Sequence, residues 1–310
     1  MNIIKFNNSV LKYDGKWLET DETPTPPPTP VDPYNPLNLP PNTVRVRTND
    51  GNVPIKGHQE TSYETATLVS GTTDVYDVYR SGTSFDYLLY RSYNIIEVLG
   101  ANTSNITSMV YMFNGCTSLT TVALFDTSKV TDMSAMFCVC SSLTTVPLFN
   151  TSKAINMQYM FVSCSSLTTV PLFNTSNVTV MEGMFDYCSS LTTVPLFNTS
   201  KATNMQYMFV GCTSLTTVPL FDTSNVRNMF RMFGECRSLQ TVPLFDTSKV
   251  TDMRYTFDGC TSVESGALAL YQQASTQSNP PQQHSYTFRN CGSNTTTGSA
   301  ELAQIPNDWK

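Results

Sequence analysis

The chain has 310 residues, which is enough for a sizeable hydrophobic core and for roughly one to three domains. Charged residues make up only 14% of it and the formal net charge is −6, which argues against nucleic acids and anionic membranes as main partners. The sequence has no run of about 18 apolar residues and therefore predicts no membrane-spanning helix.

The first 20 residues contain two short alternating segments on either side of Asp14-Gly15, a pattern typical of a β-hairpin. A lone hairpin is unstable in water. We therefore expect residues 1–20 to anchor the chain to a virion or surface scaffold protein. The predicted anchoring side chains are apolar: Ile3, Ile4, Phe6, Leu11 and Trp17. The segment does not read as a secretory signal, so a protein that works outside the cell is expected to leave it by another route or to have had its signal removed.

Residues 21–43 hold nine of the 18 prolines and predict a semi-rigid polyproline II linker, up to roughly 70 Å long at about 3.1 Å per residue. Residues 44–101 predict a β-rich N-terminal cap that ends in a degenerate repeat, with Phe85, Leu88 and Leu89 at its inner positions. An atypical first repeat is typical of the end of a repeat stack, because it covers the open core.

Residues 102–269 are seven copies of a 24-residue unit with the consensus [ND]-T-S-x-V-x-x-M-x-x-M-F-x-x-C-x-S-L-T-T-V-P-L-F. Position 1 is the opening Asn or Asp. Cysteine recurs at position 15 of every copy, at Cys116, Cys140, Cys164, Cys188, Cys212, Cys236 and Cys260. A repeat of this length predicts a solenoid, in which each unit buries its apolar side against the next.

The first half of each unit predicts a short helix. In the second unit the apolar residues lie 3, 3, 1 and 3 positions apart, at Val130, Met133, Met136, Phe137 and Cys140. Asp126 or Ser128 would supply the N-cap oxygen.

The second half predicts a short parallel strand of about Leu-Thr-Thr-Val. Leu143, Val146 and Leu148 are expected to point inward, and Pro147 is expected to end the strand. Stacked at about 4.8 Å, eight such strands would form a sheet roughly 35–40 Å long.

Units such as "DTSKVTDMSAMFCVCSSLTTVPLF" and "DTSNVRNMFRMFGECRSLQTVPLF" resemble the BspA-like leucine-rich repeats of bacterial surface proteins, over about residues 78–269. The resemblance implies an α/β solenoid, a leucine-rich-repeat-like right-handed stack of short strands and helices. It also implies a non-enzymatic surface protein that binds host proteins, cells or matrix. Residues 270–310 predict a mixed C-terminal cap, with helices at "ALYQQAS" and "SAELAQIPNDWK" and a strand at "SYTFRNC".

Cysteine, methionine and phenylalanine recur at fixed positions of the unit, and the first two are expected in the core. We interpret the cysteines as buried free thiols rather than a metal or disulfide array, because only His58 and His284 could assist as ligands. Cys138 and Cys291 stand outside that column, and their exposure is left open. The methionines fit core filling better than an adaptable groove. The Phe column beginning at Phe125 is either a buried aromatic spine or an exposed stripe for stacking sugars.

Two surfaces are candidates for binding. The first is the Thr column, which could bind a repetitive glycan or ice but also simply favours strands: Thr121, Thr145, Thr169, Thr193 and Thr217. The second is the set of positions that differ between copies, through recognition or through drift: Tyr111, Tyr159, Tyr187, Tyr207, Phe230, Arg231, Arg254 and Tyr255.

The sequence contains no constellation typical of an enzyme, and we predict no catalytic residue, metal or cofactor. We expect a bacteriophage virion-attached fibre or decoration protein whose repeats bind a host-surface or mucosal glycan or protein. One alternative is a bacterial cell-surface adhesin of the BspA-like class, and another is a Thr-ladder ice or polysaccharide binder. Assembly into a homo-oligomer is left open.

Overall fold

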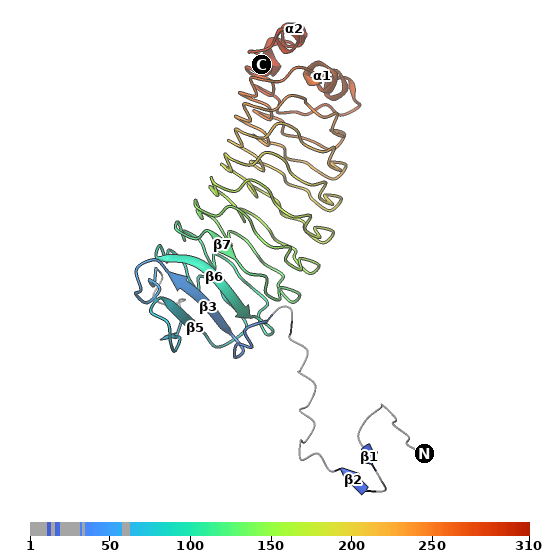
Figure 1. Ribbon diagram of the computed structural model, residues 1–310. Helices are drawn as coiled ribbons and strands as arrows, with labels where there is room; N and C mark the ends of the chain where they lie inside the picture. Colours follow the sequence, from blue (N-terminus) through green and yellow to red (C-terminus); the bar gives the residue numbers. More distant parts are fainter. Residues whose placement is uncertain (1–10, 14–15, 19–31, 33–34, 58–62) are drawn as a thin grey trace. The chain divides into compact units, whose positions relative to one another are not determined.

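The computed structural model describes residues 11–13, 16–18, 32, 35–57 and 63–310 (Figure 1). The chain divides into two units, Met1–Asp32 and Pro33–Lys310. In the first unit β1 (Leu11–Tyr13) pairs antiparallel with β2 (Lys16–Leu18). The predicted anchoring residues Ile3, Ile4 and Phe6 lie outside the described residues, as do the side chains of Leu11 and Trp17. Anchoring therefore stays a prediction.

The second unit begins with a five-stranded sheet in the order β4-β5-β3-β6-β7. Its strands are β3 (Thr43–Thr48), β4 (Thr65–Leu68), β5 (Val75–Tyr79), β6 (Ile95–Asn102) and β7 (Thr121–Val122). All neighbours pair antiparallel except β6 and β7, which are parallel, with Val98 opposite Val122. These two valines are one 24-residue period apart, so the sheet passes into the repeat stack at this pair.

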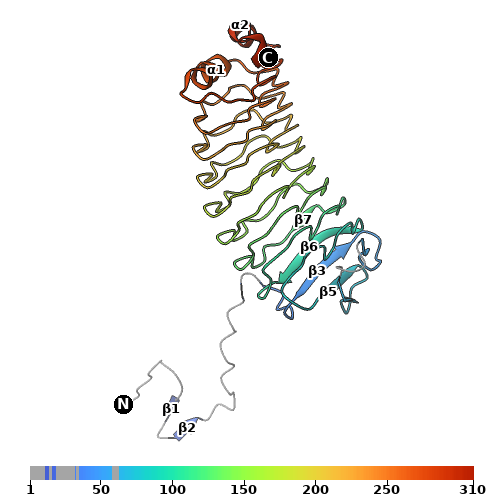
Figure 2. The ribbon, with the colours of Figure 1, turned by 180° about the vertical axis from the view of Figure 1, so that it is seen from behind.

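From Ser84 onward the chain winds through stacked coils, one for each unit (Figure 2). Parallel backbone bridges join position 7 of each coil to position 7 of the next, as at Asp132 and Asn156. The five-stranded sheet closes one end of the stack, and two helices close the other (Figure 1). Each coil is therefore bonded to its neighbours at a constant offset of one repeat, which is a repeat fold.

The predicted helix in the first half of each unit is wrong, because this segment is a series of turns. Ala135 and Val139 have φ angles of 52° and 59°, in the left-handed region. Alternate amides consequently point out of the coil and bond to the next one, as from Ala135 N to Gln158 O at 2.8 Å and from Phe137 N to Met160 O at 2.9 Å. The amides between them close four-residue turns, as from Met136 N to Met133 O at 3.2 Å, so no α-helical ladder forms.

The predicted strand in the second half is largely wrong as well. Among the described repeats only β7 forms a ladder, and a typical later copy has one long backbone bond, from Thr168 N to Thr144 O at 3.3 Å. Phe149 N bonds to Pro147 O at 2.9 Å, which makes a tight turn with Leu148 at its tip. Leu148 therefore points outward and is 58% exposed, which contradicts the prediction that it lies in the core.

The remaining inner columns are buried as predicted. Every described methionine lies in the core, and the Phe column from Phe125 to Phe245 is a buried aromatic spine rather than an exposed stripe. The cysteines of the main column are buried free thiols. Cys140 Sγ donates to the Phe113 carbonyl at 3.1 Å, and burial raises the pKa of this thiol well above its usual value. Cys291 is also buried, whereas Cys138 is half-buried.

The opening Asn-Thr-Ser or Asp-Thr-Ser of each unit starts a turn and not a helix. Asp126 Oδ1 accepts a hydrogen bond from Ser128 N at 2.8 Å, which is an Asx-turn. The Thr127 side chain is buried, and its hydroxyl donates to the Asn150 carbonyl at 2.9 Å. Later units repeat the contact, so position 2 forms a buried hydroxyl ladder that ties each coil to the next.

The C-terminal cap contains α1 (Ala267–Thr276), α2 (Thr296–Gln304) and the 3-10 helix η1 (Asn307–Trp309). The predicted strand at "SYTFRNC" is wrong. Tyr286 and Asn290 have φ angles of 62° and 59°, and Gln283 bridges to Asp252, so the segment forms one more coil. The sequence carries a signal for it, because "YTFDGC" at 255–260 recurs as "YTFRNC" at 286–291.

Candidate binding surface

The varied positions of the repeat come together where the backbone is left-handed. Position 10 has φ angles between 52° and 60° in every unit, including Tyr111, Tyr159 and Tyr207. A left-handed residue costs about 1–2 kcal/mol unless it is glycine. The coil accepts this conformation because it turns the neighbouring amides toward the next coil. The longer side chains at position 10 then reach the surface, where they are half-buried.

Seven side chains, from positions 9 and 10 of the repeat and from the C-terminal cap, form one continuous cluster over the last three units and the extra coil of that cap. We call it the aromatic–arginine surface: Tyr207, Phe230, Arg231, Arg254, Tyr255, Tyr286 and Arg289. Its rings are in contact from coil to coil, with centroids 5.3 Å apart for Tyr207 and Phe230, 5.8 Å for Phe230 and Tyr255, and 5.1 Å for Tyr255 and Tyr286. The aromatic–arginine surface thus contains a ladder of four aromatic rings.

Three arginines lie over this ladder. The Arg254 guanidinium is 5.2 Å from the centre of the Phe230 ring, and that of Arg231 is 5.6 Å from the Tyr255 ring. Arg289 lies over both Tyr255 and Tyr286, at 5.4 Å and 5.0 Å. Cation–π contacts of this kind hold the guanidinium planes against the rings.

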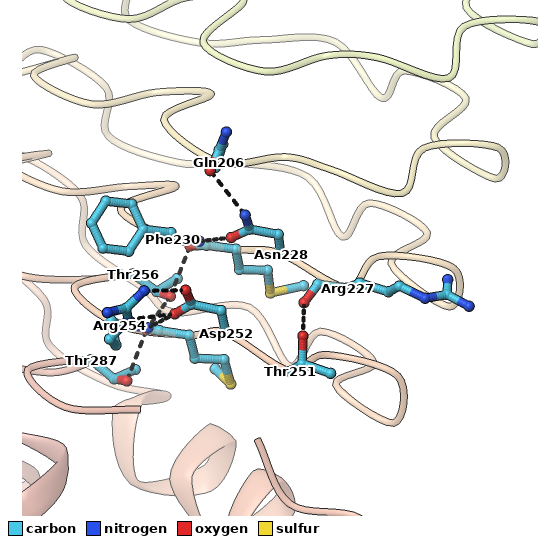
Figure 3. Close-up of polar contacts among 11 residues, drawn as sticks. Gln206, Arg227, Asn228, Phe230, Thr251, Asp252, Arg254, Thr256 and Thr287 are labelled. Carbon is cyan, nitrogen blue, oxygen red and sulfur yellow. Dashed lines mark hydrogen bonds and ion pairs between the residues drawn. The ribbon is translucent and has the colours of Figure 1, made fainter. Parts of the chain in front are cut away.

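Hydrogen bonds at position 7 orient the cluster from below (Figure 3). Asn228 accepts from Phe230 N at 2.9 Å through Oδ1 and donates to Gln206 at 2.9 Å. Asp252 accepts from the backbone of Arg254 at 3.0 Å and from its guanidinium at 3.0 and 2.7 Å. The Asx-turn at position 7 therefore fixes the backbone of the coil. In the seventh unit Asp252 also fixes the side chain of Arg254 at position 9.

A buried carboxylate holds the last arginine. Asp258 is only 1% exposed and accepts two hydrogen bonds from Arg289, at 2.8 and 2.6 Å. A bidentate pair of this kind fixes the plane of the guanidinium as well as its position. Arg289 is itself exposed, so its guanidinium is presented to solvent in one orientation on the side away from the rings.

Asp186 and Arg231 form an incomplete pair at the edge of the cluster. Asp186 Oδ1 and Arg231 Nε are buried atoms that have no hydrogen-bond partner among the described residues. Burial raises the pKa of the Asp186 carboxyl to about 6, although the nearby charge of Arg231 acts in the opposite direction. The two residues belong to units four and six, so their coupling crosses an intervening coil.

Other predicted site residues lie elsewhere on the stack. Tyr111 stacks on Tyr87 at 4.9 Å near the N-terminal cap. The Tyr159 hydroxyl donates to Glu182, and Tyr187 is 57% exposed. The Thr column, Thr121 to Thr217, is exposed, but at positions distant in the repeat from the aromatic–arginine surface. Sequence reasoning missed Tyr286 and Arg289, although the recurring "YTF" could have revealed both.

A second surface was not predicted. We call it the leucine face, and it consists of the exposed position-23 residues Leu148, Leu172, Leu196, Leu220 and Leu244 with the half-buried prolines before them and the exposed Thr columns. The leucines are 52% to 60% exposed. Units two to five contribute the identical segment Thr-Thr-Val-Pro-Leu to this face, whereas the aromatic–arginine surface varies from unit to unit.

The described part of the chain contains no group of three His, Cys, Asp or Glu side chains that could hold a metal ion. Within the same residues, no helix is long and apolar enough to cross a membrane. A hollow of about 260 Å³ lies between the sixth and seventh units and the C-terminal cap, with Arg227, Lys249 and Asn279 in its lining. Its lining is mainly polar, and no metal-ligand set accompanies it.

Comparison with known proteins identifies the family. The model of a family described as "Mycoplasma protein of unknown function, DUF285" matches residues 83–192 and 167–270, which together span more than half of the chain. The chain belongs to the DUF285 family. The matched region runs from the degenerate repeat to the start of the C-terminal cap, so the family corresponds to the stack of coils. The search of curated proteins found no match.

Solved structures similar to this DUF285 chain are leucine-rich repeat proteins. The T. pallidum leucine-rich repeat protein has 21% identity and a TM-score of 0.41, over 56% of this chain and 74% of that one. A leucine-rich repeat protein of Eubacterium ventriosum has 17% identity and a TM-score of 0.36, over 68% and 43%. A leucine-rich cell surface protein of Faecalibacterium prausnitzii has 20% identity and a TM-score of 0.34, over 57% and 62%.

Proposed function

We propose that this protein is a non-enzymatic adhesion protein that binds a host-surface or mucosal glycan or protein through the aromatic–arginine surface. One observation carries the proposal. The stack repeats its inner columns almost without change, yet at its C-terminal end four rings and three guanidiniums meet on adjacent coils. Tyrosine and arginine are among the residues that contribute most to binding free energy at interfaces.

The cluster is also held in place before any ligand arrives. Asp252 and Asp258 fix two of the arginines, and Asn228 fixes the turn that carries Phe230. Binding to such a surface loses little side-chain entropy, which favours affinity. Aromatic rings suit the apolar faces of sugar rings, and the guanidiniums suit carboxylates or sulfates on the same ligand. An acidic glycan or an acidic protein segment fits this chemistry.

A binding screen against glycans and bacterial cells tests the proposal. We expect the full chain to bind and the double variant Phe230→Ala with Tyr255→Ala to lose at least about tenfold in affinity, as truncated interface hot spots do. Tyr111→Ala is the matched control, because Tyr111 occupies position 10 of the first unit, as Tyr255 does in the seventh. Equal loss in the control and the double variant would contradict a role for this surface.

The exposed Thr column supports a second candidate, a binder of ice or of a repetitive polysaccharide. Thr145, Thr169 and Thr193 are all exposed and recur once per coil, so a ligand with a matching period could engage several at once. The variant Thr169→Lys with Thr193→Lys should then abolish binding or ice shaping. Unchanged activity would leave the aromatic–arginine surface as the remaining candidate.

We further propose that the protein is part of a bacteriophage virion, with a bacterial cell surface as the alternative. The separate N-terminal unit with its paired strands β1 and β2, followed by the proline-rich segment, suits a scaffold-attached fibre. Antibody labelling of purified phage particles and of intact bacteria distinguishes the two locations. Label on bacteria that carry no phage would contradict the virion.

A further inference from the structure

The leucine face is an apolar surface that the fold itself exposes. Each of its leucines sits at the tip of the three-residue turn after proline, and none of the five is less than 52% exposed. A leucine exposed to this extent presents on the order of 100 Å² of apolar surface. The five leucines therefore offer about 500 Å², at the upper end of what the largest patch on a monomeric protein usually reaches.

Charge is absent from this face although the whole chain is acidic. The segments 144–148, 168–172, 192–196 and 216–220 all read Thr-Thr-Val-Pro-Leu, and 240–244 reads Gln-Thr-Val-Pro-Leu. The chain has a net charge of −6, so two copies repel each other at long range. A second copy that docks on this face meets no charged side chain within these five segments.

We propose that the leucine face is a homodimer interface, on which a second copy of the chain packs its own leucine face about a two-fold axis. With the flanking prolines and threonines, the leucines bring the buried area close to the roughly 800 Å² per partner of a standard interface. A two-fold interface must be self-complementary. A row of identical side chains, one per coil over about 20 Å, meets that requirement in a parallel or an antiparallel arrangement.

Analytical ultracentrifugation of the full chain tests the proposal by measuring its mass in solution. Concentrations between about 1 and 100 μM cover the range in which dimers with modest interfaces dissociate. The native chain should be a dimer at the higher concentrations. Leu172→Lys with Leu196→Lys should raise the dimer dissociation constant by about 100-fold or more, because it buries charge at the centre of the interface. Since both side chains are exposed, the fold should be unchanged, and thermal melting confirms this.

The matched control is Ile155→Lys. Ile155 is 51% exposed, much like the leucines, but it lies at position 6, where other units carry Thr or Arg227. This variant should remain a dimer. A native chain that stays monomeric at about 100 μM, or a leucine double variant that dimerises like the native chain, would overturn the proposal.

Disulfide crosslinking distinguishes a parallel from an antiparallel arrangement of the two chains. Leu196 is the middle leucine of the row, so Leu196→Cys should link to its own copy in either two-fold arrangement and do so at least about tenfold faster than Ile155→Cys. Leu148→Cys should link to itself if the chains are parallel, and to Leu244→Cys if they are antiparallel. Equal rates for Leu196→Cys and Ile155→Cys would contradict a leucine-face dimer.

Discussion

The inner columns and the leucine face are built from the same residue types in opposite environments. Leu167 is fully buried, whereas Leu172, five residues later in the same unit, is 59% exposed. Thr175 is buried and donates to Asn198 at 2.8 Å, whereas Thr169 faces solvent. The difference shows that residue type does not decide burial here. The backbone turns decide it, because they fix which way each side chain points.

The largest expected effect is on an inner leucine. Leu167→Ala should lower the free energy of unfolding by about 2–5 kcal/mol, because it leaves a cavity between two coils that cannot collapse independently. Urea unfolding followed by circular dichroism measures this. A loss of less than about 1 kcal/mol would mean that the coils relax around the cavity and that the inner columns are less tightly packed than we infer.

The buried hydroxyl ladder gives the next effect. Thr175→Val keeps the shape of the side chain but removes the donor to the Asn198 carbonyl, and it should cost about 1–3 kcal/mol. Thr169→Val is the control on the exposed column and should change stability by less than about 0.5 kcal/mol. If both variants behave alike in urea unfolding, the buried hydroxyls do not tie the coils together.

The half-buried carboxyl of Asp186 should make the free energy of unfolding depend on pH. Its pKa rises from an ordinary 3.8 to about 6 on folding, so the folded chain holds the proton more tightly than the unfolded chain. The stability that this group contributes is greatest below about pH 4 and is lost as the pH rises through 6. At pH 7 the ionised form costs about 1–2 kcal/mol, after allowance for screening of a partly exposed group.

Asp186→Asn should therefore raise the melting temperature at pH 7 and flatten its change between pH 4 and 7. The reason is that an amide needs no proton to remain neutral in the same site. Melting curves of both proteins across this pH range provide the measurement. A variant that is less stable than the native chain at pH 7 would show that attraction to Arg231 outweighs the cost of burial.

The smallest expected effect is on the leucine face itself. At a concentration where the chain is monomeric, Leu172→Ala should change the free energy of unfolding by less than about 0.5 kcal/mol, because an exposed side chain loses few contacts. The same change should weaken dimerisation at higher concentration. A large loss of stability in the monomer would place Leu172 in the core and remove the contrast with Leu167.

The inner columns could be predicted because burial follows the 24-residue period whatever the backbone does between the columns. The turns could not be distinguished from a helix, since the 3, 3, 1 and 3 spacing of Val130 to Cys140 fits both a helix and successive four-residue turns. Glycine at position 14, in Gly115, Gly211 and Gly259, was a sequence signal against a helix, because a helix disfavours glycine. In the structure the φ angles of these glycines lie between 65° and 75°.

The candidate site could be predicted only in part. Tyr207, Phe230 and Tyr255 stand out as varied positions in a comparison of the units. Their contacts could not be foreseen, because a helix would have pointed position 9 and position 10 in other directions than the turns do. The coupling of Asp186 to Arg231 across an intervening coil depends on side-chain reach, which no pattern in the sequence expresses.

The constant offset between bonded coils has a consequence for the gene. Units three and five differ at only three positions, Ile155, Ser163 and Ser165 against Thr203, Gly211 and Thr213. Recombination between such DNA segments adds or removes whole 24-residue units in frame. Because each coil bonds to the one before it and the one after it, the new neighbours meet through the same contacts as the old. The protein can thus change its length between generations without a single compensating mutation in its core.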